Sequence, residues 1–431
     1  MNLVTVNSQG HLSIGGCDAI DLASDFGTPL YVYDVSLIRQ QLQQFHKAFK
    51  QAGVKYAISY ASKAFSIRAI DQVIAQEDGH LDVVSAGELM TAVQANFPME
   101  NVSFHGNNKS LAELQLALDN HVGTIIVDNF HELELLNKLL PEQKQSVNIM
   151  LRIAPGISAH THRYIQTGQV DSKFGFDVQS GQAEQALQLV LQNPKLNLRG
   201  YHAHIGSQIM AVTGFTALVQ KMVQLAAMWQ EKYHYQPQVL NFGGGFGIKY
   251  TNQDQPLTPQ EFVDSMVQTL RKEIAQTNLT LPEVWIEPGR SIVGEAGYSL
   301  YTIGARKNIP GIRTYVSVDG GMGDNIRPAL YQADYQAVLA ANPQARSVET
   351  VTIAGRYCES GDILAKDQQL PLSAPGDILA ILATGAYGYS MASNYNRVGR
   401  PAVVFAENGH AKLVVKRETL ADLTRLDLNY L

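Results

Sequence analysis

The sequence predicts an α/β protein in which a (β/α)8, or TIM, barrel is joined to a second, β-rich domain. Between about Tyr56 and Arg290, eight short β-rich runs alternate with amphipathic helical stretches, which is the pattern of parallel βα units. After Arg290 the runs stay β-rich, but no helical stretches separate them. The chain has 431 residues, a length that favours two or three domains.

The predicted barrel strands cover residues 57–62, 80–85, 102–105, 123–128, 148–153, 198–205, 238–242 and 284–287. Helix start signals separate them. Ser110 and Glu113 have the spacing of a capping box, and so do Thr258 and Glu261, with Pro259 at the first helical position. A further amphipathic helix over residues 34–52 precedes the first strand, and we expect it to cover the barrel floor.

The β-rich domain is predicted from runs at residues 314–318, 348–354, 377–383, 402–406 and 411–415. A run at residues 29–33 lies before the barrel and is expected to add a strand to this domain. The predicted division is therefore residues 1–33 for the N-terminal strand, 34–290 for the barrel and 291–431 for the C-terminal β domain. The barrel would then be inserted into the β domain.

Charge and composition exclude several classes of partner. The formal net charge of -6 comes from scattered residues, without a Lys/Arg block that could bind nucleic acid. The sequence has no signal-like N-terminus and no run of about 18 apolar residues, so we expect a cytoplasmic protein that does not contact a membrane. Cys17 and Cys358 lack metal-type spacing and are expected to be reduced thiols.

The candidate site lies at the C-terminal ends of the barrel strands, where barrel enzymes place their chemistry. Lys63 follows the first strand, His204 ends the sixth and Glu287 ends the eighth. A glycine run, Gly243 to Gly245, follows the seventh strand and would let backbone N–H groups approach a phosphate. A lysine beside a phosphate site favours pyridoxal 5'-phosphate (PLP), held by Lys63 as a Schiff base.

PLP chemistry then suggests roles for the neighbouring side chains. Glu287 would lie against the pyridine nitrogen and keep it protonated, which makes the ring a strong acceptor of electrons and favours decarboxylation. His204 would stack on the ring face. Asp82, at the end of the second strand, is a further candidate for cofactor binding.

Motifs along nearly the whole chain, from Gly27-Thr28-Pro29-Leu30-Tyr31 to Gly385-Ala386-Tyr387-Gly388, carry a family resemblance. The chain resembles the alanine racemase-like (fold-type III) PLP-dependent decarboxylases, and within them the diaminopimelate decarboxylase family. The resemblance implies conversion of meso-2,6-diaminopimelate to L-lysine and CO2, the last step of lysine biosynthesis.

The resemblance also implies roles at matching positions. The cofactor phosphate would be held by Ser207, Gly243, Gly244, Gly245, Glu287, Pro288, Gly289, Arg290 and Tyr387. The distal end of the amino acid substrate would contact Arg290, Arg327, Tyr331, Glu359 and Tyr387. In the family, Cys358 and Glu359 reach the site of the neighbouring subunit, so a homodimer with shared active sites is expected, with Cys358 as the proton donor.

A long connection over residues 154–181 contains His160, His162, Arg163 and Lys173, and loops of this length are usually functional. Its segment from Asp171 to Gly175 also matches the family.

Three alternatives stay open. A decarboxylase of ornithine, arginine or carboxynorspermidine would need mostly acidic partners at the distal end, whereas Arg290, Arg327 and Glu359 supply both charges. A metal-dependent barrel hydrolase would use His202 and His204, on one face of a strand, and would need further ligands at other strand ends. A non-catalytic PLP-binding protein would tend to lack the β domain or Cys358.

Overall fold

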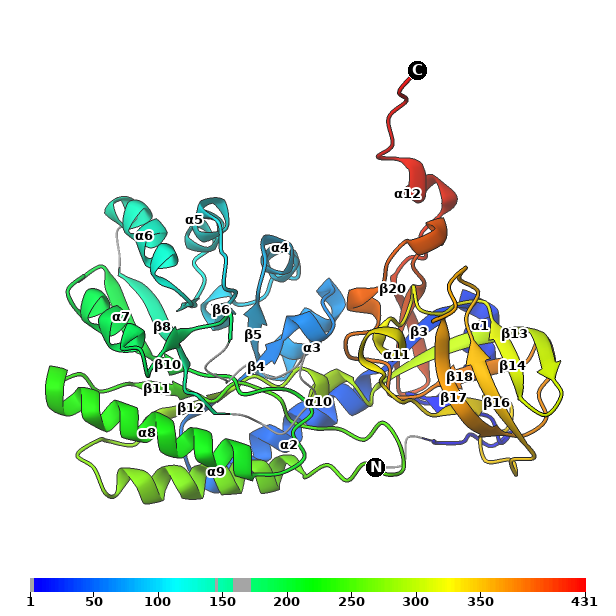
Figure 1. Ribbon diagram of the computed structural model, residues 1–431, viewed down its shortest axis with the longest axis horizontal. Coiled ribbons are helices and arrows are strands. Elements are labelled where there is room, and N and C mark those ends of the chain that lie inside the picture. The colour runs from blue at the N-terminus through cyan, green and yellow to red at the C-terminus, as the bar shows by residue number, and fades with distance from the viewer. Residues whose placement is uncertain (1–3, 144–145, 158–171) are drawn as a thin grey trace. The chain divides into compact units, whose positions relative to one another are not determined.

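The computed structural model describes residues 4–143, 146–157 and 172–431 (Figure 1). The chain divides into two compact units. The first contains Met1–Ile38, Ile248–Asp254 and Ile292–Leu431, and the second contains Arg39–Gly247 and Gln255–Ser291. The short segment Ile248–Asp254 therefore belongs to the first unit, although the residues on both sides of it in the sequence belong to the second.

The second unit is a closed barrel of eight parallel strands, which confirms the predicted fold class. The strands are β4 (Tyr56–Ala61), β5 (His80–Val83), β6 (Val102–Phe104), β7 (Thr124–Val127), β8 (Val147–Ala154), β10 (Leu196–His202), β11 (Val239–Asn241) and β12 (Glu283–Ile286). Two pairings close the ring: β12 with β4, and β8 with β10. A two-residue strand, β9 (Phe176–Asp177), pairs with the end of β8.

Helices follow the barrel strands along the chain. They are α3 (Arg68–Gln76), α4 (Ala86–Gln94), α5 (Leu111–Asp119), α6 (Phe130–Leu139), α7 (Gln182–Leu191), α8 (Thr213–Tyr233) and α9 (Pro259–Ile274), and a short α10 (Arg290–Val293) follows β12. Both predicted capping boxes are present, at the start of α5 and of α9. The side-chain oxygens satisfy backbone N–H groups that have no partner inside the helix.

The helix before the first barrel strand, α2 (Val35–Ala52), lies in the outer ring between α3 and α9 (Figure 1). On one flank, Arg39 donates from Nη1 to Glu77 Oε1, at the end of α3, at 2.7 Å. On the other flank, Arg271 of α9 donates from Nη2 to the carbonyl oxygen of Ala52, also at 2.7 Å. The helix is therefore held on both sides by ring helices, and the expectation that it covers the barrel floor is wrong.

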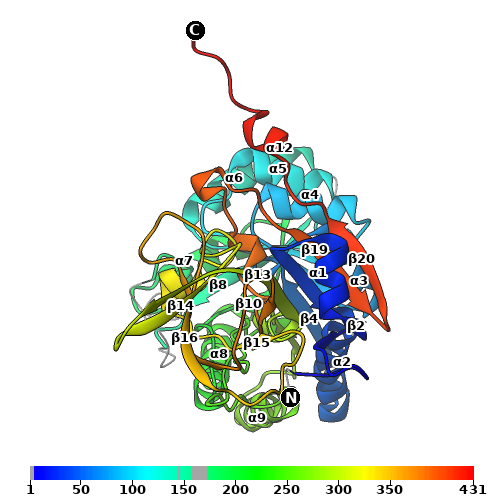
Figure 2. The same ribbon diagram turned by 90° about the vertical axis from the view of Figure 1, so that its right-hand side faces the viewer.

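The first unit is built on a sheet in which the N-terminal strand joins C-terminal strands, as predicted. The path is β17 (Ile363–Leu370), β16 (Glu349–Ala354), β14 (Arg313–Val318), β13 (Gly297–Ile309), β3 (Leu30–Asp34), β19 (Ala402–Glu407) and β20 (His410–Val415). Strand β18 (Ile378–Ile381) pairs with β13 and with β15 (Ala337–Leu339). Figure 2 shows the blue N-terminal segment beside the red strands β19 and β20.

Small elements complete the first unit: β1 (Ser13–Ile14), β2 (Cys17–Asp18), α1 (Ala19–Phe26), α11 (Arg327–Tyr331) and α12 (Leu420–Thr424). Its core is apolar and includes Leu30, Val32, Leu300, Val316 and Ile381. Among the described residues, no helix combines the length and hydrophobicity that a membrane crossing requires.

Candidate active site

A cavity of about 310 Å³ opens at the C-terminal ends of the barrel strands. Its lining includes four of the predicted site residues, namely Lys63, Asp82, His204 and Glu287. The lining also includes His105, Arg152, Lys173, Phe174 and His202. The barrel thus brings side chains from six strands, β4, β5, β6, β8, β10 and β12, to one place.

Lys63 lies in a single 3-10 turn, Ser62–Ala64, directly after β4. Its side chain is exposed and lines the cavity, while Ser62 and Ala64 on either side are buried. The loop after β12 packs closely against this turn, because a Cβ atom on Gly289 would lie 3.0 to 3.1 Å from Ala61 and Ala64. The lysine therefore projects from a turn whose backbone has little room to move.

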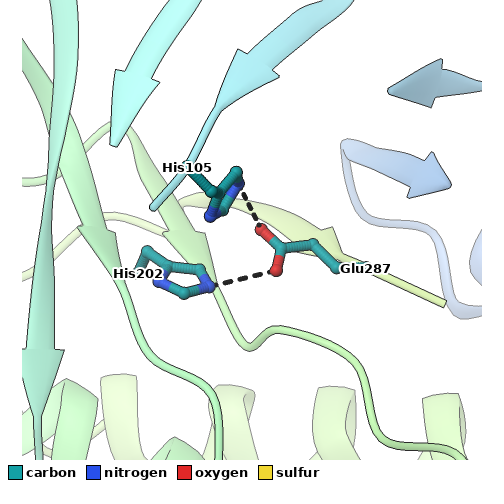
Figure 3. Close-up of side chains that lie close together, drawn as sticks. All are labelled: His105, His202 and Glu287. Atoms are coloured by element: carbon teal, nitrogen blue, oxygen red, sulfur yellow. Dashed lines mark hydrogen bonds and ion pairs between the residues drawn. The ribbon is translucent and has the colours of Figure 1, made fainter. Parts of the chain in front are cut away.

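Glu287 is the most heavily contacted acid of the cavity (Figure 3). Its Oε1 lies 3.2 Å from His105 Nε2 and accepts a hydrogen bond from Asn241 Nδ2 at 2.6 Å, and its Oε2 lies 3.1 Å from His202 Nε2. All four side chains are buried. Burial raises the pKa of a carboxyl group, but His105 and His202 hold the pKa of Glu287 well below its usual value. The group is an anion at neutral pH.

In two titratable groups near this carboxylate, His202 and Asp82, burial shifts the pKa toward the neutral form. Burial lowers the pKa of His202 to about 4, although the nearby Glu287 opposes the change, so the imidazole is neutral at pH 7. Burial also raises the pKa of Asp82, and the opposing effect of His105, whose Nε2 lies 3.7 Å from Asp82 Oδ1, does not cancel it. Burial thus favours the neutral forms of His202 and Asp82, whereas the two imidazoles favour the anionic form of Glu287.

His204 is oriented by the glycine loop that follows β11. Its Nδ1 accepts a hydrogen bond from the backbone N–H of Gly244 at 3.2 Å. Burial, followed by the charge of Lys63, lowers the pKa of His204 well below its usual value. A neutral ring that accepts through Nδ1 carries its proton on Nε2.

The glycine loop packs backbone against backbone, so side chains have no room there. A Cβ atom on Gly244 would lie 2.0 Å from the carbonyl oxygen of Glu287, and one on Gly245, where φ is +109°, would lie 2.3 Å from that of Gly206. Next to Gly206, Ser207 Oγ accepts a hydrogen bond from Arg290 Nη2 at 2.9 Å. The structure thus brings together the predicted phosphate-binding residues that belong to the barrel.

The comparisons with known proteins assign the family. The model for "Pyridoxal-dependent decarboxylase, pyridoxal binding domain" matches residues 35–294. The chain is 55% identical to the diaminopimelate decarboxylase of Bacillus methanolicus over 96% of each chain. It is 54% identical to that of Bacillus subtilis, over 98% of this chain and 97% of the relative. The chain belongs to the diaminopimelate decarboxylase family.

A solved diaminopimelate decarboxylase supports the same assignment at the level of structure. The enzyme from M. jannaschii, in complex with L-lysine, matches with a TM-score of 0.93 and 35% identity, covering 99% of this chain and 98% of that one. The resemblance that we drew from the motifs is therefore confirmed.

The residues of the cavity, together with the glycine loop that contacts His204, fit a pyridoxal cofactor. An amine on a constrained turn, a buried anionic carboxylate and a glycine loop beside an arginine are the three features that an aldehyde, a pyridine nitrogen and a phosphate require. Among the described residues, His105, His202 and Glu287 also form a metal-ligand-type group whose donor atoms all lie within 4.8 Å of one another. The metal-dependent hydrolase that we considered would use His202 and His204 together, whereas this group contains His202 without His204.

The remaining site residues predicted for a diaminopimelate decarboxylase belong to the first unit: Arg327, Tyr331, Cys358, Glu359 and Tyr387. Arg327 is buried at the start of α11, and its Nη1 donates to the hydroxyl groups of Tyr250, at 2.9 Å, and of Tyr335. The two tyrosine rings also lie beside the guanidinium group. Neither tyrosine was predicted, because only the fold brings residues 250 and 335 to residue 327.

The loop that carries Cys358 and Glu359 is anchored by a buried carboxylate. Asp362 accepts hydrogen bonds from the backbone N–H groups of Met322, at 2.6 Å, and Tyr357, at 2.8 Å. Cys358 and Glu359 are exposed, and the backbone N–H of Cys358 donates to Asn396 Oδ1 at 2.9 Å. The loop is thus fixed at its base and presents its thiol and carboxylate outward.

Part of the long connection after β8 reaches the cavity. Lys173 lines it, and Phe174 packs on Arg152, whose guanidinium carbon lies 4.2 Å from the ring centroid. The predicted residues His160, His162, Arg163 and Asp171 lie outside the described residues. Arg152, His105 and Asn241 had no role in the sequence prediction, although a charged residue inside the apolar run of β8 is a signal that could have found the first.

Proposed function

We propose that this protein is a PLP-dependent carboxy-lyase that converts meso-2,6-diaminopimelate to L-lysine and CO2. The observation that supports this most directly is the buried, anionic Glu287 in the same cavity as the exposed amine of Lys63. Family membership supports the same reaction. When bound, PLP supplies an electron-poor ring that accepts the electron pair released as CO2 departs.

Lys63 is proposed to be the residue that would hold the cofactor covalently, through its side-chain amine. Glu287 would accept a hydrogen bond from the ring nitrogen and keep the proton on that nitrogen. His204, fixed by Gly244, would lie against the ring face as a neutral imidazole. Asp82 would lie at the edge of the cofactor, where burial raises the pKa of its carboxyl group.

The phosphate group is proposed to bind at the turn formed by Gly243–Gly245 and the Glu287–Arg290 segment, including Pro288 and Gly289. The hydrogen bond between Arg290 and Ser207 supports this assignment, because it places a cation and a hydroxyl group next to the glycine loop. Tyr387 is proposed to bind the phosphate as well.

The far end of the substrate is proposed to bind Arg290, Arg327, Tyr331, Glu359 and Tyr387. Arg327 suits a carboxylate because both of its tyrosine bonds use Nη1, so Nη2 and Nε can form the two parallel bonds of a guanidinium–carboxylate pair. Glu359 would take the distal ammonium group. A substrate such as ornithine has no distal carboxylate and would leave Arg327 as a buried, unpaired cation.

The active enzyme is proposed to be a homodimer in which Cys358 and Glu359 enter the site of the partner subunit. Their exposure on an anchored loop supports this proposal. Cys358 would then give a proton to the carbon that has lost CO2. A cytoplasmic location, expected from composition, stays a prediction.

A substrate panel with CO2 detection tests this function. We expect meso-diaminopimelate to release CO2 and yield L-lysine, while ornithine, arginine and lysine react far more slowly. Faster release from ornithine or arginine would replace the proposed substrate, and release from none would favour a non-catalytic PLP-binding protein.

A further inference from the structure

Glu287 is held by three side chains to which the proposed function gives no part: His105 and His202, drawn in Figure 3, and Asn241. The contacts are 3.2 Å from His105 Nε2 to Oε1, 2.6 Å from Asn241 Nδ2 to Oε1 and 3.1 Å from His202 Nε2 to Oε2. The exposed fraction is 3% for His105, 1% for His202 and 0% for Asn241. Such buried polar groups are costly unless they serve each other or a ligand.

The three side chains reach the carboxylate from different parts of the barrel. His202 and Asn241 are register partners at the ends of the adjacent strands β10 and β11, and β12, which precedes Glu287, pairs with β11. His105 follows β6, which β4 and β5 separate from β12 in the ring. The contacts therefore depend on backbone pairing and ring closure, and they fix the carboxylate from two directions.

The contacts leave room for a further hydrogen bond to the carboxylate. A carboxylate offers about four acceptor positions, two on each oxygen. Among the described residues, Oε1 has a hydrogen bond to Asn241 and Oε2 has one to His202, while His105 Nε2 lies 3.2 Å from Oε1 without the geometry of a hydrogen bond. Glu287 can thus accept one more hydrogen bond from a ligand.

We propose that His105, His202 and Asn241 are positioning residues, which fix Glu287 as an oriented carboxylate so that it can accept the hydrogen bond of the PLP ring nitrogen. This inference rests on the proposed function and deepens it. His105 Nε2 also lies 3.7 Å from Asp82 Oδ1, so it faces two carboxyl groups. His202 has no second carboxylate among its described contacts, which makes it the cleaner position to test.

The test compares two substitutions of His202 with two cofactors. His202→Phe removes the donor and keeps a ring of similar size, and His202→Gln keeps an amide N–H near the position of Nε2. Each apoenzyme is titrated with PLP and with 1-deaza-PLP, in which a C–H group replaces the ring nitrogen, and the absorbance of the bound cofactor gives the affinity.

We expect His202→Phe to weaken PLP binding roughly ten-fold or more, the size of one hydrogen bond to a charged group. Binding of the deaza analogue, which has no ring nitrogen for Glu287 to contact, should stay as in the wild type. His202→Gln should recover most of the PLP affinity. His80→Phe is the matched control. His80 begins β5, at the opposite end of the strand from the cavity, and packs edge-on against Trp285. This substitution should change neither affinity.

Equal weakening for both cofactors would show that His202 supports only the local packing, and no weakening for either would also overturn the proposal. If His202→Phe fails to fold, Asn241→Leu makes the same comparison through Oε1. A wild-type apoenzyme that binds neither cofactor would instead overturn the proposed function itself.

Discussion

Arg327 donates from Nη1 to the hydroxyl group of Tyr250 at 2.9 Å, and this contact joins α11 to a segment that precedes it by 77 positions in the chain. The second bond, to Tyr335, makes the guanidinium a shared partner of two phenols. Because both bonds use the same nitrogen, they fix the plane of the group that we propose for the distal carboxylate.

Tyr250→Phe should therefore weaken substrate binding without removing the charge of Arg327. We expect KM for diaminopimelate to rise about ten-fold, with little change in kcat. Without the Tyr250 hydroxyl the guanidinium of Arg327 is less well oriented toward the distal carboxylate, which weakens binding but does not touch the reacting end of the substrate. Steady-state kinetics measure the split. Tyr235→Phe is the control, since that hydroxyl binds the carbonyl oxygen of Leu198 elsewhere; an unchanged KM for Tyr250→Phe would refute the substrate role of Arg327.

Gly244→Ala should abolish cofactor binding. The added Cβ atom would lie 2.0 Å from the carbonyl oxygen of Glu287, so the glycine loop or Glu287 must move. Gly87→Ala is the control. Gly87 lies in α4, and an added Cβ atom there would meet only Ser85 Oγ, at 3.7 Å, so this variant should keep the cofactor and stabilise the helix by about 0.5–1 kcal/mol. Cofactor absorbance after purification and thermal unfolding distinguish the two variants, and a fully loaded Gly244→Ala enzyme would contradict the assigned phosphate site.

Cys358→Ala should retain the cofactor but lose turnover by roughly 10²-fold or more if the thiol is the proton donor. Cys17→Ala, a half-buried thiol in the β1–β2 hairpin, is the control and should keep its activity. Mixing Lys63→Ala with Cys358→Ala subunits should restore part of the activity, because one kind of mixed site would contain both native residues. No recovery after mixing would argue for self-contained subunits.

Asp71 should make the stability of the protein depend on pH. Burial, and then the nearby Glu88, raise the pKa of Asp71 to about 8, and its Oδ1 has no hydrogen-bond partner among the described residues. The folded state therefore binds a proton that the unfolded chain releases near pH 4, so this stability is present at low pH and is lost as pH rises toward 8.

Asp71→Asn should remove this loss of folding stability at high pH. Relative to the wild type, the variant should gain on the order of a few kcal/mol as pH rises from 5 to 8.5. Urea unfolding at the two pH values measures the difference, and Asp119→Asn, at the exposed end of α5, should show no such trend. A constant difference between Asp71→Asn and the wild type would mean that Asp71 is ionised in the folded protein.

The sequence was sufficient for all eight barrel strands because each is a short apolar run between helical signals. Strand β13 was missed, although it is the longest strand of the other sheet, because its second half is mostly exposed and carries Arg306 and Lys307 rather than apolar residues. Lys63 and Glu287 could be predicted from their positions at strand ends. His105 and Asn241 could not be assigned to Glu287, because ring closure and strand register decide which strand-end side chains meet.

The central claim is that the amine of Lys63 carries the cofactor. The most direct measurement is reduction of the cofactor-loaded protein with borohydride, followed by peptide mass spectrometry. The account predicts a pyridoxyl phosphate adduct on Lys63, and predicts that Lys63→Ala has neither the adduct nor turnover. A label on another amine, or on none, would contradict it.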